Sequence, residues 1–429
     1  MISQEALLRA CFAVGFAVWV GGFVVAASRR KLSYALISLC LTLPLTIAGM
    51  NISAALLTAT LLWLLVRGEK LPWRAALIPA NYALWVYFAV ALLVSAMAVD
   101  TSRCWPDIQR DLHRLWVFPL FLVAFAAAPS PRGHLAMAAS FLFAAGVGVF
   151  QALTQRVGEN VPAELMTRMR AHAFVHPVTY GQQMTLAILG GLCFMRRPLS
   201  EKSWRWNLAA SLAFLAAALS ALILSQGRGA FVSLAAGFAA ICVVDRRFRK
   251  YGYLALAAGA AGIALLEVIP ESSRSLSGTL LKEGFFKGDN NLNPQFHRLI
   301  LWRVAVDMFK DYPLLGIGLG NYKTAFVSYF QGKVDGQWVW HSAHNLYIHQ
   351  LAERGLVGFG VLIALLGLLT ARAYRRVKED PSAPNLWAWA SMVAFLFMNL
   401  TESTFQVEMM STTMFFIWAW AEANHPRPK

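Results

Sequence analysis

Long apolar runs recur along the whole of this 429-residue chain, and they constrain its fold more than any other feature. A run of about 20 apolar residues is long enough to cross the hydrocarbon core of a bilayer as a helix. Hydrophobic residues make up 58% of the chain and charged residues only 14%, which is too apolar for a soluble protein of this size. The sequence therefore predicts an all-α polytopic membrane protein.

About thirteen runs qualify as spans by length and hydropathy, or about twelve if one of the first three is a partial span. They lie near residues 8–27, 32–50, 52–66, 75–98, 112–128, 134–153, 178–195, 206–224, 229–244, 251–269, 345–370, 386–401 and 409–421. The first run ends in basic residues rather than at a small-residue cleavage site, so we expect a span there and no removable signal.

Three short loops carry clusters of basic residues, and these clusters predict the orientation of the chain. They are Arg196, Arg197, Lys202 and Arg205; Arg246, Arg247, Arg249 and Lys250; and Arg372, Arg375, Arg376 and Lys378. Lysine and arginine accumulate in cytoplasmic loops. The net charge of +16 therefore reflects orientation and requires no nucleic-acid partner. Counting spans from these loops places 99–111, 154–177, 225–228, 270–343 and the turn at 401–403 on the outer side.

The segment 270–343 is the only large loop, and it divides the chain into three parts. They are an N-terminal transmembrane bundle (1–269), the loop domain (270–343) and C-terminal transmembrane helices (344–429). The middle of the loop predicts a helix, because Asn293 can cap it, Pro294 suits its first position and Pro313 follows its end.

One face of that helix is apolar, which predicts a helix lying along the outer membrane-water interface. The apolar residues are Phe296, Leu299, Ile300, Val304 and Met308. The glycines at 316, 318 and 320 follow no strand, so they indicate a turn between helices rather than a phosphate-binding loop.

A histidine-rich stretch follows the large loop where water should meet bilayer. It contains His341, His344 and His349, and Asn345 and Glu353 would share a helical stripe with His349. Ionisable groups at the edge of a membrane are a functional hypothesis by default, and a histidine is suited to act as a general base near neutral pH. The alternative is an interfacial helix cap whose polar residues simply face water.

Arginines gather on the same predicted side. Arg228 would begin the span 229–244, where a cation opposes the helix dipole unless an anion binds there. The alternative for Arg228 is snorkelling to phospholipid head groups. Arg170 and His176 lie in a second basic outer loop. Guanidinium groups suit phosphate, so a lipid-linked pyrophosphate attacked by a hydroxyl is the expected chemistry.

Metal chemistry is not expected from the sequence. No outer loop holds an Asp-x-Asp pair, and the histidines lack the His-Glu-x-x-His arrangement of a zinc site. The five cysteines have no metal-binding spacing either. We therefore predict no metal ion and no cofactor.

Four motifs in this order resemble the O-antigen ligase and polymerase superfamily. They are Ser-Gln-Gly-Arg228-Gly, Arg298-Leu-Ile-Leu-Trp302, Asp311-Tyr-Pro-Leu-Leu-Gly-Ile-Gly-Leu-Gly-Asn-Tyr322, and His344-Asn-Leu-Tyr-Ile-His-Gln-Leu-Ala-Glu-Arg-Gly-Leu-Val-Gly358. The resemblance implies a glycosyltransferase C-like helical fold with its large loop in the periplasm. It also implies a metal-independent, inverting transfer of O-antigen from undecaprenyl pyrophosphate to the lipid A-core oligosaccharide at the bacterial inner membrane.

The resemblance also implies residue roles. Arg228 and Arg298 would bind the donor pyrophosphate, with Arg170 as a weaker match, and His344 would activate the acceptor hydroxyl. Acceptor-side or secondary roles fall to Asn345, His341, Arg303 and His176. The competing hypotheses are an O-antigen polymerase or a protein O-oligosaccharyltransferase using the same donor. A transporter is a further alternative, but it would place ionisable residues in mid-span rather than at one face.

Overall fold

The computed structural model describes residues 32–128, 133–157, 170–195, 204–250, 252, 294–330 and 340–423, and every regular element in these ranges is a helix. The α-helices are α2 (Leu32–Thr42), α3 (Ile47–Val66), α4 (Pro79–Ala96), α5 (Trp105–Ala127), α6 (Gly133–Val157), α8 (Pro177–Phe194), α9 (Trp204–Ser225), α10 (Arg228–Val244), α12 (Pro294–Asp311), α13 (Tyr322–Tyr329), α14 (Leu346–Glu379), α15 (Ala383–Thr401) and α16 (Glu408–Ala423). Short 3₁₀ turns are η1 (Trp73–Ala76), η2 (Thr101–Arg103) and η4 (Thr404–Gln406). The predicted all-helical class is confirmed for these residues.

Five helices in the described ranges are long and apolar enough to cross a membrane: α3, α4, α6, α9 and α14. The chain is therefore a multi-pass membrane protein. The predicted spans 8–27 and 251–269 lie outside the described residues, so the total of about twelve spans stays a prediction.

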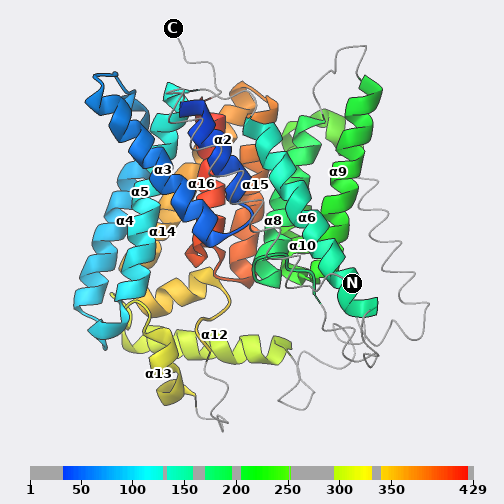
Figure 1. Ribbon diagram of the computed structural model, residues 1–429. Coiled ribbons are helices and arrows are strands. Elements are labelled where there is room, and N and C mark those ends of the chain that lie inside the picture. The colour runs from blue at the N-terminus through cyan, green and yellow to red at the C-terminus, as the bar shows by residue number, and fades with distance from the viewer. Residues whose placement is uncertain are drawn as a thin grey trace.

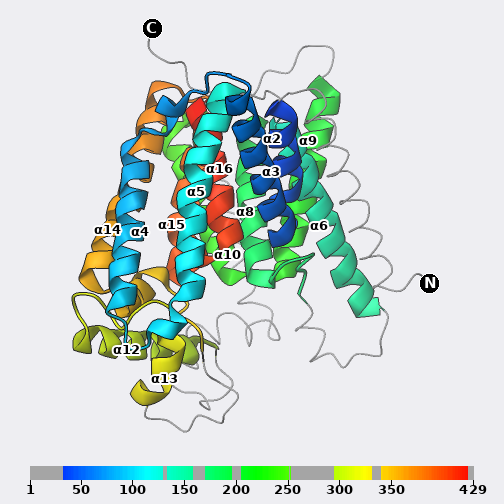
Figure 2. The same cartoon turned by 60° about the vertical axis from the view of Figure 1, so that its left-hand side comes forward.

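The long helices stand side by side, and α12 and α13 lie across one end of the bundle (Figures 1 and 2). In the interior, α16 packs against α5 and α15, and α15 packs against α8, α10 and α14. The α14–α15 connection and the exposed Arg67, Lys70 and Arg74 between α3 and α4 lie at the end opposite α12 (Figure 1). For the α14–α15 connection, this placement opposite α12 agrees with the basic cluster at residues 372–378, and the side of the membrane on which each end lies stays a prediction.

The predicted helix limits differ from the structure at α2, α3 and α5. The chain breaks between α2 and α3 at residues 43–46, not near Asn51, because Thr46 caps α3 by accepting a hydrogen bond from the Gly49 backbone N–H at 2.8 Å. Helix α5 begins at Trp105, so the outer loop 99–111 is shorter than predicted. Its first turns escaped the hydropathy pattern because they contain the charged Asp107, Arg110 and Asp111, of which Asp111 is buried and paired with Arg114.

Helix α14 is longer than the predicted span 345–370, and it is broken at Gly355, which has φ 59° and ψ −164°. The α12–α13 connection fills the break. The backbone N–H groups of Leu356 and Val357 donate to the carbonyls of Pro313 and Leu314, at 2.8 and 3.1 Å. Backbone groups inside a bilayer need such partners, since no water is available there.

The glycine run in that connection is a turn between helices, as predicted. Gly316, Gly318 and Gly320 all have positive φ, and a Cβ on Gly316 would lie 2.4 Å from the carbonyl carbon of Glu353. Only glycine fits this close approach to α14.

The apolar face of α12 packs on protein, and the position of this helix along the outer membrane-water interface stays a prediction. Its buried residues are Leu301, Val304, Ala305 and Met308, of which the sequence pattern predicted Val304 and Met308. They form one core with Tyr322 and Phe326 of α13 and with Ala343 and Ala352. The side chain of Phe296 and the predicted cap Asn293 lie outside the described residues.

Candidate functional site

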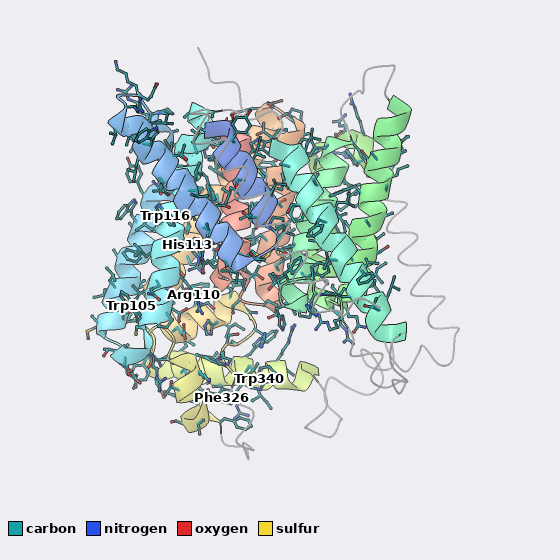
Figure 3. The ribbon with its side chains drawn as sticks, in the orientation of Figure 1. Trp105, Arg110, His113, Trp116, Phe326 and Trp340 are labelled. Carbon is teal, nitrogen blue, oxygen red and sulfur yellow. The ribbon has the colours of Figure 1, made fainter. Side chains whose placement is uncertain are left out.

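Four short segments meet at the α12 end of the bundle. They are residues 170–176 before α8, 225–228 between α9 and α10, 340–345 before α14, and 401–404 after α15. The Ala171 N–H donates to the Leu224 carbonyl at 2.9 Å. A Cβ on Gly229 would lie 2.3 Å from Thr401 Oγ1, so the start of α10 touches the end of α15. Trp340, labelled in Figure 3, marks the segment before α14.

Glu402 joins two of the predicted site residues. Its Oε2 lies 2.6 Å from His344 Nδ1, and its Oε1 accepts a hydrogen bond from an Nη of Arg298 at 2.8 Å. The side chains of His344 and Arg298 are 31% and 37% exposed, so both remain accessible to a substrate. The residue before His344 is held by Trp302, whose indole N–H donates to the Ala343 carbonyl at 3.0 Å.

The contact with Glu402 fixes how His344 can act. An ionised carboxylate can only accept hydrogen bonds. A neutral His344 that is hydrogen-bonded to Glu402 is therefore assigned the tautomer with its proton on Nδ1. Its Nε2 then carries a lone pair, and none of the described residues forms a hydrogen bond with it. A base oriented by a carboxylate behind it is the arrangement that activates hydroxyl groups in hydrolases.

Asn345, not His344, caps α14. The Asn345 side-chain oxygen accepts hydrogen bonds from the backbone N–H groups of Tyr347 and Ile348, at 3.0 and 3.2 Å. The histidine-rich stretch therefore does contain a helix cap, but the capping residue is Asn345 and not His344. The cap occupies the oxygen of Asn345, which is the atom that would otherwise accept from an acceptor sugar.

Backbone strain is concentrated in these same segments. In the described ranges, the non-glycine residues with positive φ are Ala173, Gln226 and His344, at 47°, 53° and 47°. Each belongs to a different one of the four site segments. Such conformations cost on the order of 1–3 kcal/mol and cluster where a function requires them.

Arg170 and His176 lie within electrostatic reach of Glu402. The Arg170 Nε donates to the Ser225 carbonyl at 2.6 Å, and burial lowers the pKa of Arg170 while the charge of Glu402 opposes that effect. His176 begins α8 by accepting from the Val178 N–H at 3.4 Å. Partial burial, followed by the positive charge of Arg170, lowers the pKa of His176 and favours its neutral form.

Arg228 is the first residue of α10 and is exposed. Its neighbour Gly229 packs on Thr401, directly before Glu402. The structure thus brings Arg170, Arg228 and Arg298 to one end of the bundle, where Arg298 and Arg170 interact with Glu402.

One predicted site residue of α12 and two histidines of the histidine-rich stretch form no contact with Glu402. Arg303 is 84% exposed and lies 3.9 Å from Asp307. His341 is exposed, and partial burial and then Lys323 lower its pKa. His349 is 3% exposed and lies 3.3 Å from Glu353, so this part of the predicted polar stripe is buried.

Glu402 is the site residue that the sequence analysis missed. Its signal was a single acidic residue in a three-residue turn between two apolar spans. That turn was assigned to the outer side, but no sequence neighbour of Glu402 indicated that it would meet His344, which is 58 residues away.

The fold and the site define a class of protein: a multi-pass helical membrane protein with an arginine-rich, histidine-bearing site at one end of its bundle. Residues 212–363 match the family model described as O-antigen ligase, which is the family that the motifs predicted. The match includes Arg228, Arg298 and His344, whereas Arg170, His176 and Glu402 lie outside it. A comparison with curated proteins finds no match to the chain.

Proposed function

We propose that the protein is an O-antigen ligase. It transfers O-antigen polysaccharide from undecaprenyl pyrophosphate to the lipid A-core oligosaccharide, at the periplasmic face of the bacterial inner membrane, with inversion at the anomeric carbon and without a metal ion. The observation that carries this proposal is the bridge from Arg298 through Glu402 to His344, set among the other arginines at one end of the bundle.

The charge of the site suits the donor. Arg170, Arg228 and Arg298 contribute three positive charges and Glu402 one negative charge, which leaves +2. A pyrophosphate diester carries two negative charges, so the donor neutralises the site. Arginine forks bind phosphate oxygens bidentately and stabilise the charge that develops on the leaving pyrophosphate.

His344 acts on the acceptor. Its Nε2 takes the proton of a sugar hydroxyl while the hydroxyl oxygen attacks the anomeric carbon of the donor glycan. A new carbon–oxygen bond forms as the bond to the pyrophosphate oxygen breaks, and the electron pair leaves with undecaprenyl pyrophosphate. Glu402 stabilises the imidazolium that results. A single displacement of this kind inverts the anomeric configuration.

The orientation follows from the basic loops. The C-terminal end of α14, which carries Arg372, Arg375, Arg376 and Lys378, lies at the end of the bundle opposite α12 (Figure 1). Such basic clusters are retained in the cytoplasm. The site then opens to the periplasm, where lipid-linked glycan and lipid A-core are both exposed.

A deletion strain and its complementation test the proposal. Loss of long glycan from the lipid A-core, with accumulation of lipid-linked polymer, is the expected lipopolysaccharide profile. A core capped by single repeat units would instead indicate an O-antigen polymerase. An unchanged lipopolysaccharide profile with loss of glycan from proteins would indicate an oligosaccharyltransferase.

A further inference from the structure

A buried ion cluster lies inside the bundle, apart from the proposed active site. Asp111 of α5 accepts hydrogen bonds from Arg114 of α5 and from Arg354 of α14, each at 2.5 Å. All three side chains are at most 2% exposed. Asp111 lies in sequence between Arg110 and His113, which Figure 3 labels on α5. A buried ion pair is weak evidence of a purely stabilising role, because desolvation offsets much of its attraction.

Arg354 connects the cluster to the segment that carries His344. It is the last residue before the break at Gly355, and the helical segment 346–354 leads directly back to His344. The Arg354 guanidinium lies over the Tyr87 ring at 4.4 Å, and the Tyr87 hydroxyl donates to Gln350 at 2.9 Å. The short segment is therefore tied to α4 and α5 by Arg354 and Gln350.

Arg114 connects the cluster to the turn that carries Glu402. Its guanidinium lies over the ring of Phe405 at 4.9 Å, and its Nε donates to Ser411 at 3.3 Å. Phe405 follows Glu402 by three residues, and its backbone N–H donates to Asn399 at 2.8 Å. Arg114 therefore contacts the turn after α15 from inside the bundle.

We infer that Asp111 is a positioning residue that sets the distance between His344 and Glu402. Through Arg354 it holds the helical segment 346–354, which follows His344, and through Arg114 it holds the turn after α15, which contains Glu402. These two segments are called the carriers of His344 and Glu402 below. The inference rests on the proposed function, in which Glu402 orients His344 as the base. A shift of about 1 Å in a reacting group lowers a rate on the order of a hundredfold, so small movements of either carrier matter.

The chain offers a matched control at the other end of the bundle. Glu422 of α16 accepts hydrogen bonds from Arg372 and Arg376 of α14, which repeats the composition of two arginines around one carboxylate. Glu422 is 14% exposed, and its partners Arg372 and Arg376 lie near the C-terminal end of α14, whereas His344 precedes the N-terminal end. Removing its charge disturbs a comparable ion cluster without touching either carrier.

A double-mutant cycle on purified full-length protein tests the inference. We expect Asp111→Asn to lower kcat on the order of a hundredfold with little change in KM for the lipid-linked donor, and Asp111→Glu to restore part of the rate. In a Glu402→Gln background, Asp111→Asn should lower kcat by less than about twofold, since the arrangement that it supports is already lost. Glu422→Gln should leave kcat unchanged relative to each background.

Equal fold-losses from Asp111→Asn in both backgrounds, with active wild-type protein, would overturn the inference and leave the proposed function intact. Absence of transfer by the wild-type protein would overturn both. If Asp111→Asn does not accumulate as folded protein, Tyr87→Phe decides the question, because it removes only the hydrogen bond to Gln350. A smaller loss of kcat that disappears in the Glu402→Gln background supports the inference, and a loss of equal size in both backgrounds contradicts it.

Discussion

Replacing Glu402 by glutamine is the most informative single change in the proposed active site. The glutamine keeps the size of the side chain but removes the charge that lies 2.6 Å from His344 Nδ1 and 2.8 Å from an Nη of Arg298. Its amide group can also donate to Nδ1, which moves the proton of a neutral His344 to Nε2 and blocks that nitrogen as a base.

The size of the effect follows from the geometry. Two unit charges about 4 Å apart interact by about 4 kcal/mol at an effective dielectric constant of 20. Since Glu402 is 18% exposed and His344 is 31% exposed, water screens part of this interaction. A remaining loss of about 2–3 kcal/mol in the transition state lowers kcat on the order of a hundredfold.

The assay is transfer of a lipid-linked glycan to purified core acceptor by reconstituted protein. We expect kcat to fall while KM for the donor stays constant or decreases, because Arg298 loses its carboxylate partner and becomes free to bind phosphate. Glu402→Asp, which keeps the charge on a shorter side chain, serves as the control and should be intermediate. A Glu402→Gln protein with most of the wild-type kcat would refute the role of the carboxylate.

Four further outcomes follow from the same structure. Arg228→Lys and Arg298→Lys keep the positive charge but lose the planar fork, so transfer should fall at least about tenfold in folded protein, measured as initial rate. EDTA should leave the wild-type rate unchanged, because a site with net positive charge repels divalent cations; inhibition reversed by added metal would contradict this. His349→Ala should lower the melting temperature more than kcat, since His349 is buried against Glu353; a selective loss of kcat would contradict a structural role. In a background without other cysteines, Arg303→Cys should react with an impermeant thiol reagent in intact spheroplasts and Lys70→Cys should not; the reverse pattern would invert the orientation.

Much of the fold was predictable because the bilayer imposes a length and a polarity on each span. The hydropathy pattern failed where charged side chains are buried inside the bundle. Asp111 and Arg114 lie within the described helix α5, yet their mutual pairing, which sequence does not display, makes their burial possible. The break in α14 likewise depends on a partner segment, because the α12–α13 connection satisfies its backbone groups.

The candidate site was predictable in part for a related reason. Arg228, Arg298 and His344 stand in motifs that a single stretch of sequence displays. Glu402 does not, because its role arises from packing of the α15–α16 turn against the segment before α14. Arg303 shares its helix with Arg298, but it lies on an exposed face, which a count of charges in the loop does not reveal.

The most direct test of the proposed function is transfer by purified protein from an undecaprenyl pyrophosphate-linked glycan to lipid A-core, compared between wild type and His344→Gln. Glutamine retains hydrogen-bonding groups but cannot accept a proton, so the account predicts robust transfer by the wild-type protein and a loss of at least about a hundredfold in the variant between about pH 6 and pH 8, with donor binding preserved. A variant that keeps most of the wild-type rate across that range would show that His344 is not the base.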